Sequence, residues 1–168
     1  MHLTDLLVAD RVAIRHPANG VPALDKPGAI RILSSLLGGA ELSIEGSATQ
    51  VRLDNDEIER VLLDREKLQS TGIGEGVAIP HGAMTQLVSQ VAALLIVPDG
   101  VDFAAIDERK VTILFAVIGP KRATGEHLKT LARVSRLLRN QSFRDLLVSA
   151  KDARTAYDLI AAEEGDPR

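Results

Sequence analysis

The sequence predicts an α/β or α+β domain in which helices cover a central β-sheet. Two apolar runs, VAALLIV at 91–97 and VTILFAVIG at 111–119, are rich in Val and Ile and are bounded by Pro, Gly and Asp. Such runs are typical of central strands buried on both faces. Helical spacing of apolar residues before and after them gives the order strand, helices, several strands, helices, which is that of a layered domain.

The first part of the chain contains one expected strand and two expected helices. Alternating, β-branched residues predict a short strand at 12–15. A helix is expected from Pro27 to the glycines at 38–39, and a second from Asp54 to Leu68, with acidic residues at its start that complement the helix dipole. The expected apolar positions are Ala29, Ile32, Leu33 and Leu36 in the first helix and Ile58, Val61, Leu62 and Leu68 in the second.

The other expected elements lie around the central strands. A four-residue strand at 77–80 ends at His81, after a segment at 72–76 whose glycines imply an unusual backbone path. Thr124 is expected as the N-cap of a helix that reaches about Leu138. Further helical segments are expected at 143–148 and 153–162, followed by a loose tail at 163–168.

Composition restricts the class of protein. A chain of 168 residues with 45% hydrophobic residues is expected to form a single domain over 1–168. The net charge of -3 and the scarcity of aromatic residues argue against nucleic acid or an anionic membrane as a direct partner. The absence of cysteine excludes disulfides and thiolate chemistry. No apolar run is long enough to insert in a membrane, so a cytoplasmic protein is expected.

His81 is the strongest candidate for a functional side chain. It follows a strand that is expected to be buried, and its neighbours Pro80 and Gly82 fix the path of the chain and leave room for another molecule. The alternative is a turn histidine that only hydrogen-bonds its surroundings. Surface roles suffice for His2 and His16, which lie near the beginning of the chain or in a Pro-rich turn.

Two further residues are candidates for a site with this histidine. Arg65 lies seven residues after Ile58, so it is placed on the apolar side of its helix, where a guanidinium needs an anion; the alternative is an ion pair with Glu66 or Asp64. His127 lies in the first turn of the expected helix at 124–138 and shares a face with apolar residues. Its alternative is a neutral histidine satisfied at the edge of the core.

Together these residues predict a phosphoryl-transfer site that needs no metal and no cofactor. A neutral imidazole at His81 is a nucleophile at cytosolic pH. Catalysis of phosphoryl transfer depends mostly on positioning and on stabilising charged oxygens, which suits Arg65 and an imidazole N–H of His127. Backbone N–H groups at 72–76 are possible additional donors.

The segment STGIGEGVAIPHG resembles the active-site signature of the fructose/mannitol class of enzyme IIA of the bacterial phosphotransferase system. In that signature an acidic or amide residue, here Glu66, precedes by seven positions a hydrophobic-Gly-x-x-aliphatic-Ala-aliphatic-Pro-His-Gly pattern, here Ile73–Gly82. The later segment VDFAAIDERKVTILFAVIGP is similar to the family's FxAID motif and the core strand that follows it. The likeness extends roughly from Leu3 to Ala162.

The resemblance implies a role for each candidate. His81 is then the phosphorylated histidine, Arg65 the active-site arginine and His127 the second active-site histidine. The family fold is a mixed β-sheet covered by helices, so the predicted fold class is α/β (α+β-like), with a mixed sheet of about five strands in a single enzyme IIA type 2 domain over 1–168.

Within the class, STGIG and FAAID look more like the nitrogen-regulatory type than a sugar-specific enzyme IIA. The resemblance then implies an HPr-like donor (NPr), charged by a phosphoenolpyruvate-dependent enzyme I, and regulatory target proteins that bind according to phosphorylation state. A sugar-specific enzyme IIA that passes phosphate to a IIB domain for fructose or mannitol uptake is the alternative.

Two more distant alternatives belong to other functional classes. A non-catalytic interaction module with this fold would be expected to lose the histidine, and His81 is retained. A hydrolytic or metal enzyme is disfavoured because no carboxylate stands at metal-ligand spacing beside His81 or His127.

Overall fold

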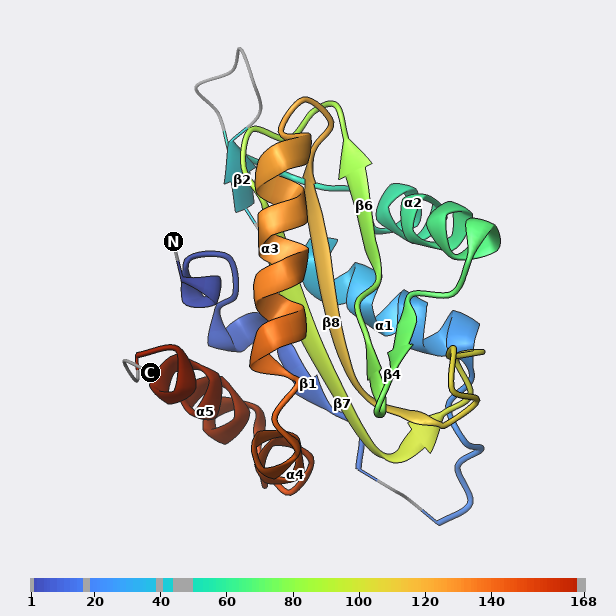
Figure 1. The fold of residues 1–168 in the computed structure, drawn as a ribbon. Helices are drawn as coiled ribbons and strands as arrows, with labels where there is room; N and C mark the ends of the chain where they lie inside the picture. The colour runs from blue at the N-terminus through green and yellow to red at the C-terminus, as the bar shows by residue number, and fades with distance from the viewer. Residues whose placement is uncertain (1, 17–18, 39–40, 44–49, 166–168) are drawn as a thin grey trace.

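The computed structural model contains a mixed six-stranded sheet, which confirms the predicted fold class (Figure 1). The structure describes residues 2–16, 19–38, 41–43 and 50–165, and for 41–43 and 50–52 it describes the backbone alone. The sheet runs in the order β1-β7-β8-β5-β4, and β6 also pairs with β8. Its strands are β1 (Val12–Ile14), β4 (Gly72–Gly74), β5 (Val77–Ala78), β6 (His81–Met84), β7 (Val91–Val101) and β8 (Val111–Pro120).

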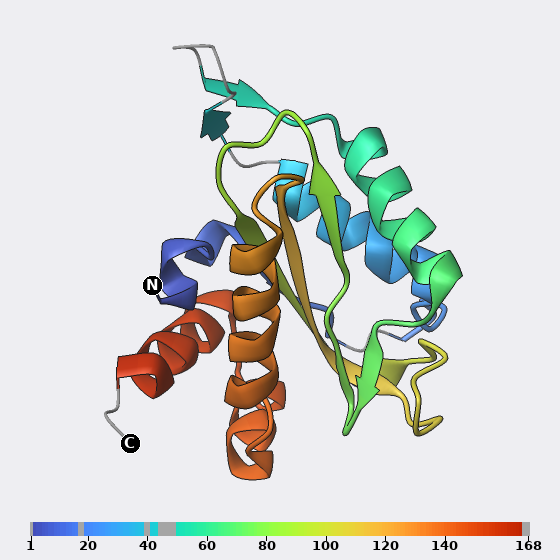
Figure 2. The ribbon, with the colours of Figure 1, turned by 45° about the horizontal axis from the view of Figure 1, so that its top comes forward.

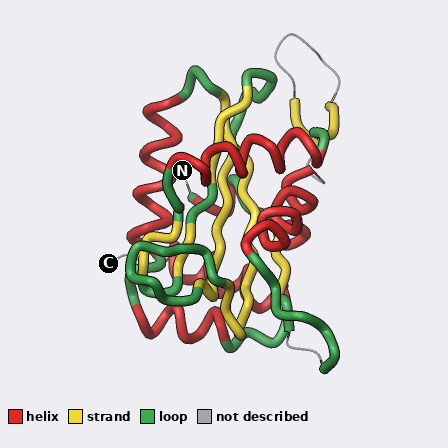
Figure 3. The backbone as a smooth tube through the Cα atoms, turned by 90° about the vertical axis from the view of Figure 1, so that its right-hand side faces the viewer, coloured by secondary structure: helices red, strands yellow, loops and turns green. Residues whose placement is uncertain are grey.

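Helices cover both faces of this sheet (Figures 1 and 3). Two apolar clusters separate the sheet from the helices, one beneath α1 and α2 and one beneath α3, α4, α5 and the N-terminal segment. None of the helices in the described ranges combines the length and apolar character needed to cross a bilayer. The helices are α1 (Lys26–Gly38), α2 (Asn55–Leu68), α3 (Thr124–Leu137), α4 (Gln141–Val148) and α5 (Ala153–Gly165), with the 3-10 helices η1 (Leu3–Asp5) and η2 (Ala9–Arg11).

β7 and β8 form the antiparallel centre of the sheet, as the two apolar runs predict. Leu94 pairs with Phe115 and the next pair is Leu95 with Leu114. Because successive side chains point to opposite faces, the first pair packs beneath α3 and the second beneath α1 and α2. All four side chains are almost completely buried, which explains why neither run alternates between polar and apolar residues.

The expected strand at 77–80 is interrupted. β5 ends at Ala78 and a separate strand, β6, begins at His81, and both pair in parallel with β8. Pro80 has no N–H to donate to a ladder, which accounts for the break. The prediction that a strand ends at His81 is therefore wrong, since His81 is the first residue of β6.

Two helix ends differ from the prediction. Ala123 is the N-cap of α3, and the Thr124 hydroxyl instead donates to the carbonyl oxygen of Lys121. α5 continues through 163–165, part of the tail expected to be loose, because Glu164 accepts the backbone N–H groups of Leu3 and Thr4 at 2.6 and 3.1 Å. The N-terminal segment around η1 and the end of α5 consequently lie side by side (Figure 2), while residues 166–168 fall outside the described residues.

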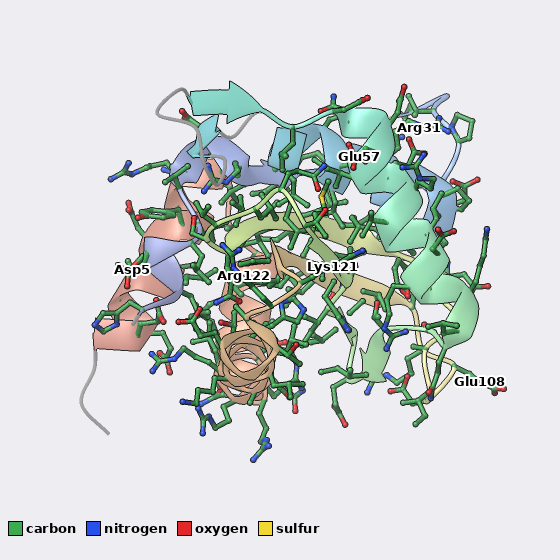
Figure 4. The ribbon with its side chains drawn as sticks, turned by 90° about the horizontal axis from the view of Figure 1, so that it is seen from above. Asp5, Arg31, Glu57, Glu108, Lys121 and Arg122 are labelled. Atoms are coloured by element: carbon green, nitrogen blue, oxygen red, sulfur yellow. The ribbon has the colours of Figure 1, made fainter. Side chains whose placement is uncertain are left out.

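Other differences concern the first part of the chain. The antiparallel hairpin of β2 (Glu41–Ser43) and β3 (Gln50–Arg52) was not predicted. Leu68, expected on the apolar face of α2, is 82% exposed, and Ile32 and Leu36 of α1 are only partly buried. Viewed from above, Arg31 and Glu57 mark α1 and α2, whereas Lys121 and Arg122 lie where β8 turns into α3 (Figure 4).

Gly82 allows α2 to pack closely on β6. A Cβ atom at this position would lie 2.4 Å from Cγ1 of Val61, although 3.8 Å from its Cβ and its carbonyl oxygen. A separation below 3 Å between carbon atoms is repulsive, so the absence of a side chain sets the distance between helix and strand. Gly82 alternates with His81 along β6, so the two residues face opposite sides of the sheet.

The replacement Gly82→Ala is expected to destabilise the protein by about 1–3 kcal/mol, because its methyl group would overlap Val61. Denaturant unfolding measures this loss. Adding Val61→Ala removes the overlapping atom, so the double variant is expected to lose less than the two single losses combined. Gly125→Ala in α3 is the control, since nothing lies within 4 Å of its added Cβ. Strictly additive losses at 61 and 82 would contradict this explanation.

Candidate functional site

The site lies at the edge of the sheet, where His81 begins β6. His81 is opposite Val117 of β8, and Val117 belongs to the apolar cluster beneath α3. Residues opposite each other in a ladder point to the same face, so the half-buried His81 ring lies on the α3 side.

The hydrogen bonds of His81 fix the position of its proton. Its Nδ1 lies 2.8 Å from the carbonyl oxygen of Ile79. A carbonyl oxygen can only accept a hydrogen bond, so Nδ1 carries the proton in the neutral ring and Nε2 keeps a lone pair. Arg65 donates from Nε to this Nε2 at 3.3 Å.

Arg65 reaches His81 from the last turn of α2. It lies four residues after Val61, the residue packed on Gly82, and so shares the helix face that meets β6. A second donor, Nη1, binds the carbonyl oxygen of Gln69 at 2.8 Å and fixes the guanidinium. No ion pair of Arg65 with Glu66 or Asp64 is formed; Asp64 instead pairs with Lys67 at 3.3 Å.

Glu66 holds the end of α2 against the sheet. Its buried carboxylate accepts the backbone N–H of Thr71 at 2.9 Å and the Thr71 hydroxyl at 2.5 Å, and Lys26 of α1 lies at 3.8 Å. The buried positions of α2 are Ile58, Leu62 and Glu66, so Arg65 lies beside the buried face and not on it. The acidic position of the signature thus anchors the turn that follows Arg65.

His127 approaches His81 from the other side of the edge strand. It lies in the first turn of α3, as predicted, and its ring centroid is 5.6 Å from that of His81 with an interplanar angle of 54°. The structure therefore brings Arg65 and His127, from helices on opposite faces of the sheet, to one imidazole.

Burial lowers the pKa of His81 from its usual 6.5; the hydrogen bond to Ile79 opposes this shift, Arg65 adds to it, and Glu66 opposes it. Burial also lowers the pKa of His127, and the charge of His81 adds to that shift. Both rings are consequently neutral near pH 7, and Nε2 of His81 is unprotonated and accepts the hydrogen bond from Arg65.

Gly76, at the end of the glycine-rich segment, lies away from this site. The carbonyl oxygen of Gly76 accepts from Thr112 and Ile113, near the start of β8, whereas His81 lies opposite Val117. At the rise of a β-strand this separation is about 15 Å. Gly76 is therefore too far away to donate to His81, and donors from the remaining N–H groups of 72–75 stay a prediction.

The turn between β4 and β5 is attached to the FAAID segment at 103–107. Asp107 accepts the backbone N–H of Glu75 at 2.9 Å and that of Arg109 at 3.1 Å. Glu75, which has a φ of 60°, also pairs with Arg144 of α4 at 3.3 Å. The two motifs thus stabilise each other far from His81.

An open depression with a volume of about 380 Å³ exposes His81 to solvent. Its lining includes Arg65, Thr71, Ile73, Leu131 and Ser135. Ile73 is 47% exposed, so the approach to the imidazole is partly apolar. Among the described residues, no group of three or more His, Asp or Glu side chains lies close enough to hold a metal ion.

Sequence reasoning missed the Ile79 carbonyl. A backbone acceptor has no sequence signal of its own; Pro80, which cannot donate to a ladder, is the residue that could have indicated the interruption. It also missed the anchoring contacts of Glu66. The signature includes an acidic residue at this position but does not indicate what that residue contacts.

The structure combines a mixed sheet with an edge-strand histidine that contacts an arginine and a second histidine. The family model described as "Phosphoenolpyruvate-dependent sugar phosphotransferase system, EIIA 2" matches residues 22–163. The chain belongs to this EIIA type 2 family of phosphotransfer proteins.

Individual relatives include both regulatory and sugar-specific proteins. The chain is 40% identical over 101 residues to a nitrogen regulatory protein of Bradyrhizobium diazoefficiens, a match that covers 60% of this chain and 66% of that relative, slightly less than two thirds of its length. It is 29% identical over 140 residues to the fructose-specific EIIA component of Haloferax volcanii, covering 83% and 85% of the two chains. The crystal structure of nitrogen regulatory protein IIA-Ntr from Neisseria meningitidis is similar with a TM-score of 0.76 and 26% identity, over 94% of this chain and 98% of that one.

The pKa of His81 is expected to rise in the variant Arg65→Gln, because the guanidinium disfavours the protonated ring. An NMR titration of the His81 ring measures this change. Arg60→Gln, on an exposed position of the same helix, is the control and is expected to leave the titration unaltered. Equal His81 pKa values in wild type and Arg65→Gln would contradict the contact.

Proposed function

We propose that the protein is a regulatory phosphocarrier in which His81 accepts a phosphoryl group at Nε2. The observation that carries the proposal is the pair of contacts to the two ring nitrogens: Nδ1 is protonated against Ile79, and Nε2 faces Arg65. This arrangement leaves a directed lone pair at an open depression. In the proposal residues 1–168 act as one EIIA type 2 domain in the cytoplasm.

Transfer requires no proton movement at the attacking atom. As the Nε2–P bond forms, the P–N bond to a donor phosphohistidine breaks and its electron pair returns to the donor ring. The His81 ring gains positive charge, which the Nδ1–H bond to the Ile79 carbonyl stabilises. The chemistry therefore needs positioning more than acid–base catalysis.

Arg65 and His127 are proposed to stabilise the phosphoryl oxygens. Arg65 occupies the lone pair of Nε2 at 3.3 Å, a long hydrogen bond that arriving phosphorus displaces. The released guanidinium N–H is then available to an oxygen, and an N–H of His127 serves from the other side.

The proposed donor is an HPr/NPr-like carrier charged by enzyme I, and the proposed output is phosphorylation-dependent binding of regulatory proteins. Similarity to nitrogen regulatory proteins supports this choice. The alternative is a sugar-specific enzyme IIA that hands phosphate to a IIB domain, which the family description and the fructose-specific relative support. Incubating labelled protein with a IIB domain separates the two, since rapid loss of label to IIB favours the sugar-specific role.

Incubation with phosphoenolpyruvate, enzyme I and the carrier is expected to give wild type an acid-labile label that His81→Ala abolishes. His16→Ala is the control, because His16 lies on the exposed surface outside the site. Undiminished labelling of His81→Ala would refute the assignment.

Arg65→Ala and His127→Ala are each expected to slow labelling by about 100-fold or more, as loss of a charge-stabilising donor does. Rapid-quench kinetics measures the rate, and circular dichroism checks that the fold is retained. A normal rate in either variant would remove that residue from the mechanism.

A further inference from the structure

Two buried polar atoms without a hydrogen-bond partner lie next to the proposed site. Among the described residues, Oε1 of Gln90 and Nδ1 of His127 are the buried side-chain atoms left unpaired. Gln90 is only 8% exposed. Buried polar groups in native proteins are nearly always paired, so each of these atoms calls for a partner.

Both residues lie against Gly119 of β8. A Cβ atom at Gly119 would be 3.0 Å from Cγ of Gln90 and 3.3 Å from Nδ1 of His127. The amide of glutamine begins one bond beyond Cγ, so rotation about the side-chain bonds brings it within reach of the ring. Gly119 supplies the space in which the two groups meet.

The sheet register explains this meeting. Val91 of β7 pairs with Ile118 of β8, so Gln90 comes opposite Gly119 in the antiparallel ladder. On the other side of β8, Gly119 pairs with Ala83, two residues after His81. The small residues Gly119 and Ala83 thus leave room for the His127 ring, which comes from α3, between β7 and β6.

We infer that the side-chain amide of Gln90 donates from Nε2 to Nδ1 of His127 and thereby positions this ring for phosphoryl transfer. The amide can turn by 180°, which exchanges its oxygen and nitrogen and places the NH2 group against Nδ1. Nδ1 then accepts, and the ring proton stays on Nε2 of His127. Gln90 is a positioning residue, since it acts on the phosphoryl group through His127. This inference rests on the proposed function.

The orientation of the amide decides what His127 can do. With its oxygen toward Nδ1, a neutral His127 would carry the proton on Nδ1 and would offer only a lone pair at Nε2. With its nitrogen toward Nδ1, the same neutral ring offers an Nε2–H that can donate to a phosphoryl oxygen. His81 is the titratable group that acts on this ring, and burial keeps the ring neutral.

The test is ¹⁵N NMR of the His127 ring in the unphosphorylated, full-length protein. Wild type is expected to show the Nε2–H tautomer. Gln90→Met, which keeps the length of the side chain but removes the amide, is expected to give a mixture of tautomers. Gln141→Met at an exposed position of α4 is the matched control and is expected to leave His127 unchanged.

A second variant keeps the test decisive if Gln90→Met is poorly folded. In Gln90→Glu the carboxylate can only accept, so the proton is expected to move to Nδ1 and the pKa of His127 to rise. An unchanged His127 tautomer and pKa in folded variants at position 90 would overturn the inference, and so would a wild-type ring protonated at Nδ1.

Phosphoryl transfer provides the functional readout. Gln90→Met is expected to slow labelling of His81 by about tenfold, a factor that corresponds to one hydrogen bond, and a wild-type rate would overturn the positioning role. Because the NMR measurement needs no phosphoryl donor, the Gln90–His127 contact can be established even if His81 is never labelled. Failure of the contact and failure of the proposed function are therefore distinguishable.

Discussion

The hydrogen bond between Nδ1 of His81 and the carbonyl of Ile79 is the interaction on which the proposed chemistry depends. Successive carbonyls of a strand point to opposite sides: the Pro80 carbonyl accepts Val117 N–H from β8, while the Ile79 carbonyl faces the His81 ring. The position of the Ile79 carbonyl therefore selects the ring nitrogen that is proposed as the nucleophile.

The site is assembled from both layers of helices, and two glycines make this possible. Gly82 brings α2, and with it Arg65, against one side of β6. Gly119 leaves space for the His127 ring, which enters from α3 on the other face. An edge strand is the position where groups from opposite faces of a sheet can reach one imidazole, because no further strand separates them. The same exposed edge keeps the imidazole open to solvent.

Sequence patterns that reflect burial and local conformation predicted most of the fold. Features that depend on contacts between distant parts of the chain were not predicted. The runs at 91–97 and 111–119 identified the central strands because a strand that is buried on both faces has a continuous apolar sequence. Arg65 was placed near His81 correctly, but periodicity assigned it to the buried face of α2. Glu66 occupies that face instead, satisfied by Thr71 five residues later. The hydrogen bonds from Thr71 allow a carboxylate to occupy the buried face of the helix, and such bonds cannot be recognised from hydrophobic periodicity.

Charge would distinguish the two forms of the proposed phosphocarrier. A phosphoryl group on Nε2 would add close to two negative charges beside Arg65 in a depression that is otherwise partly apolar. The exposed side chain of Ile73 at this depression provides contact area in either state, whereas the charge would alter which polar groups a partner must present. A partner could then distinguish the phosphorylated from the unphosphorylated protein by electrostatic complementarity alone. The fold need not change for the phosphorylation state to be recognised.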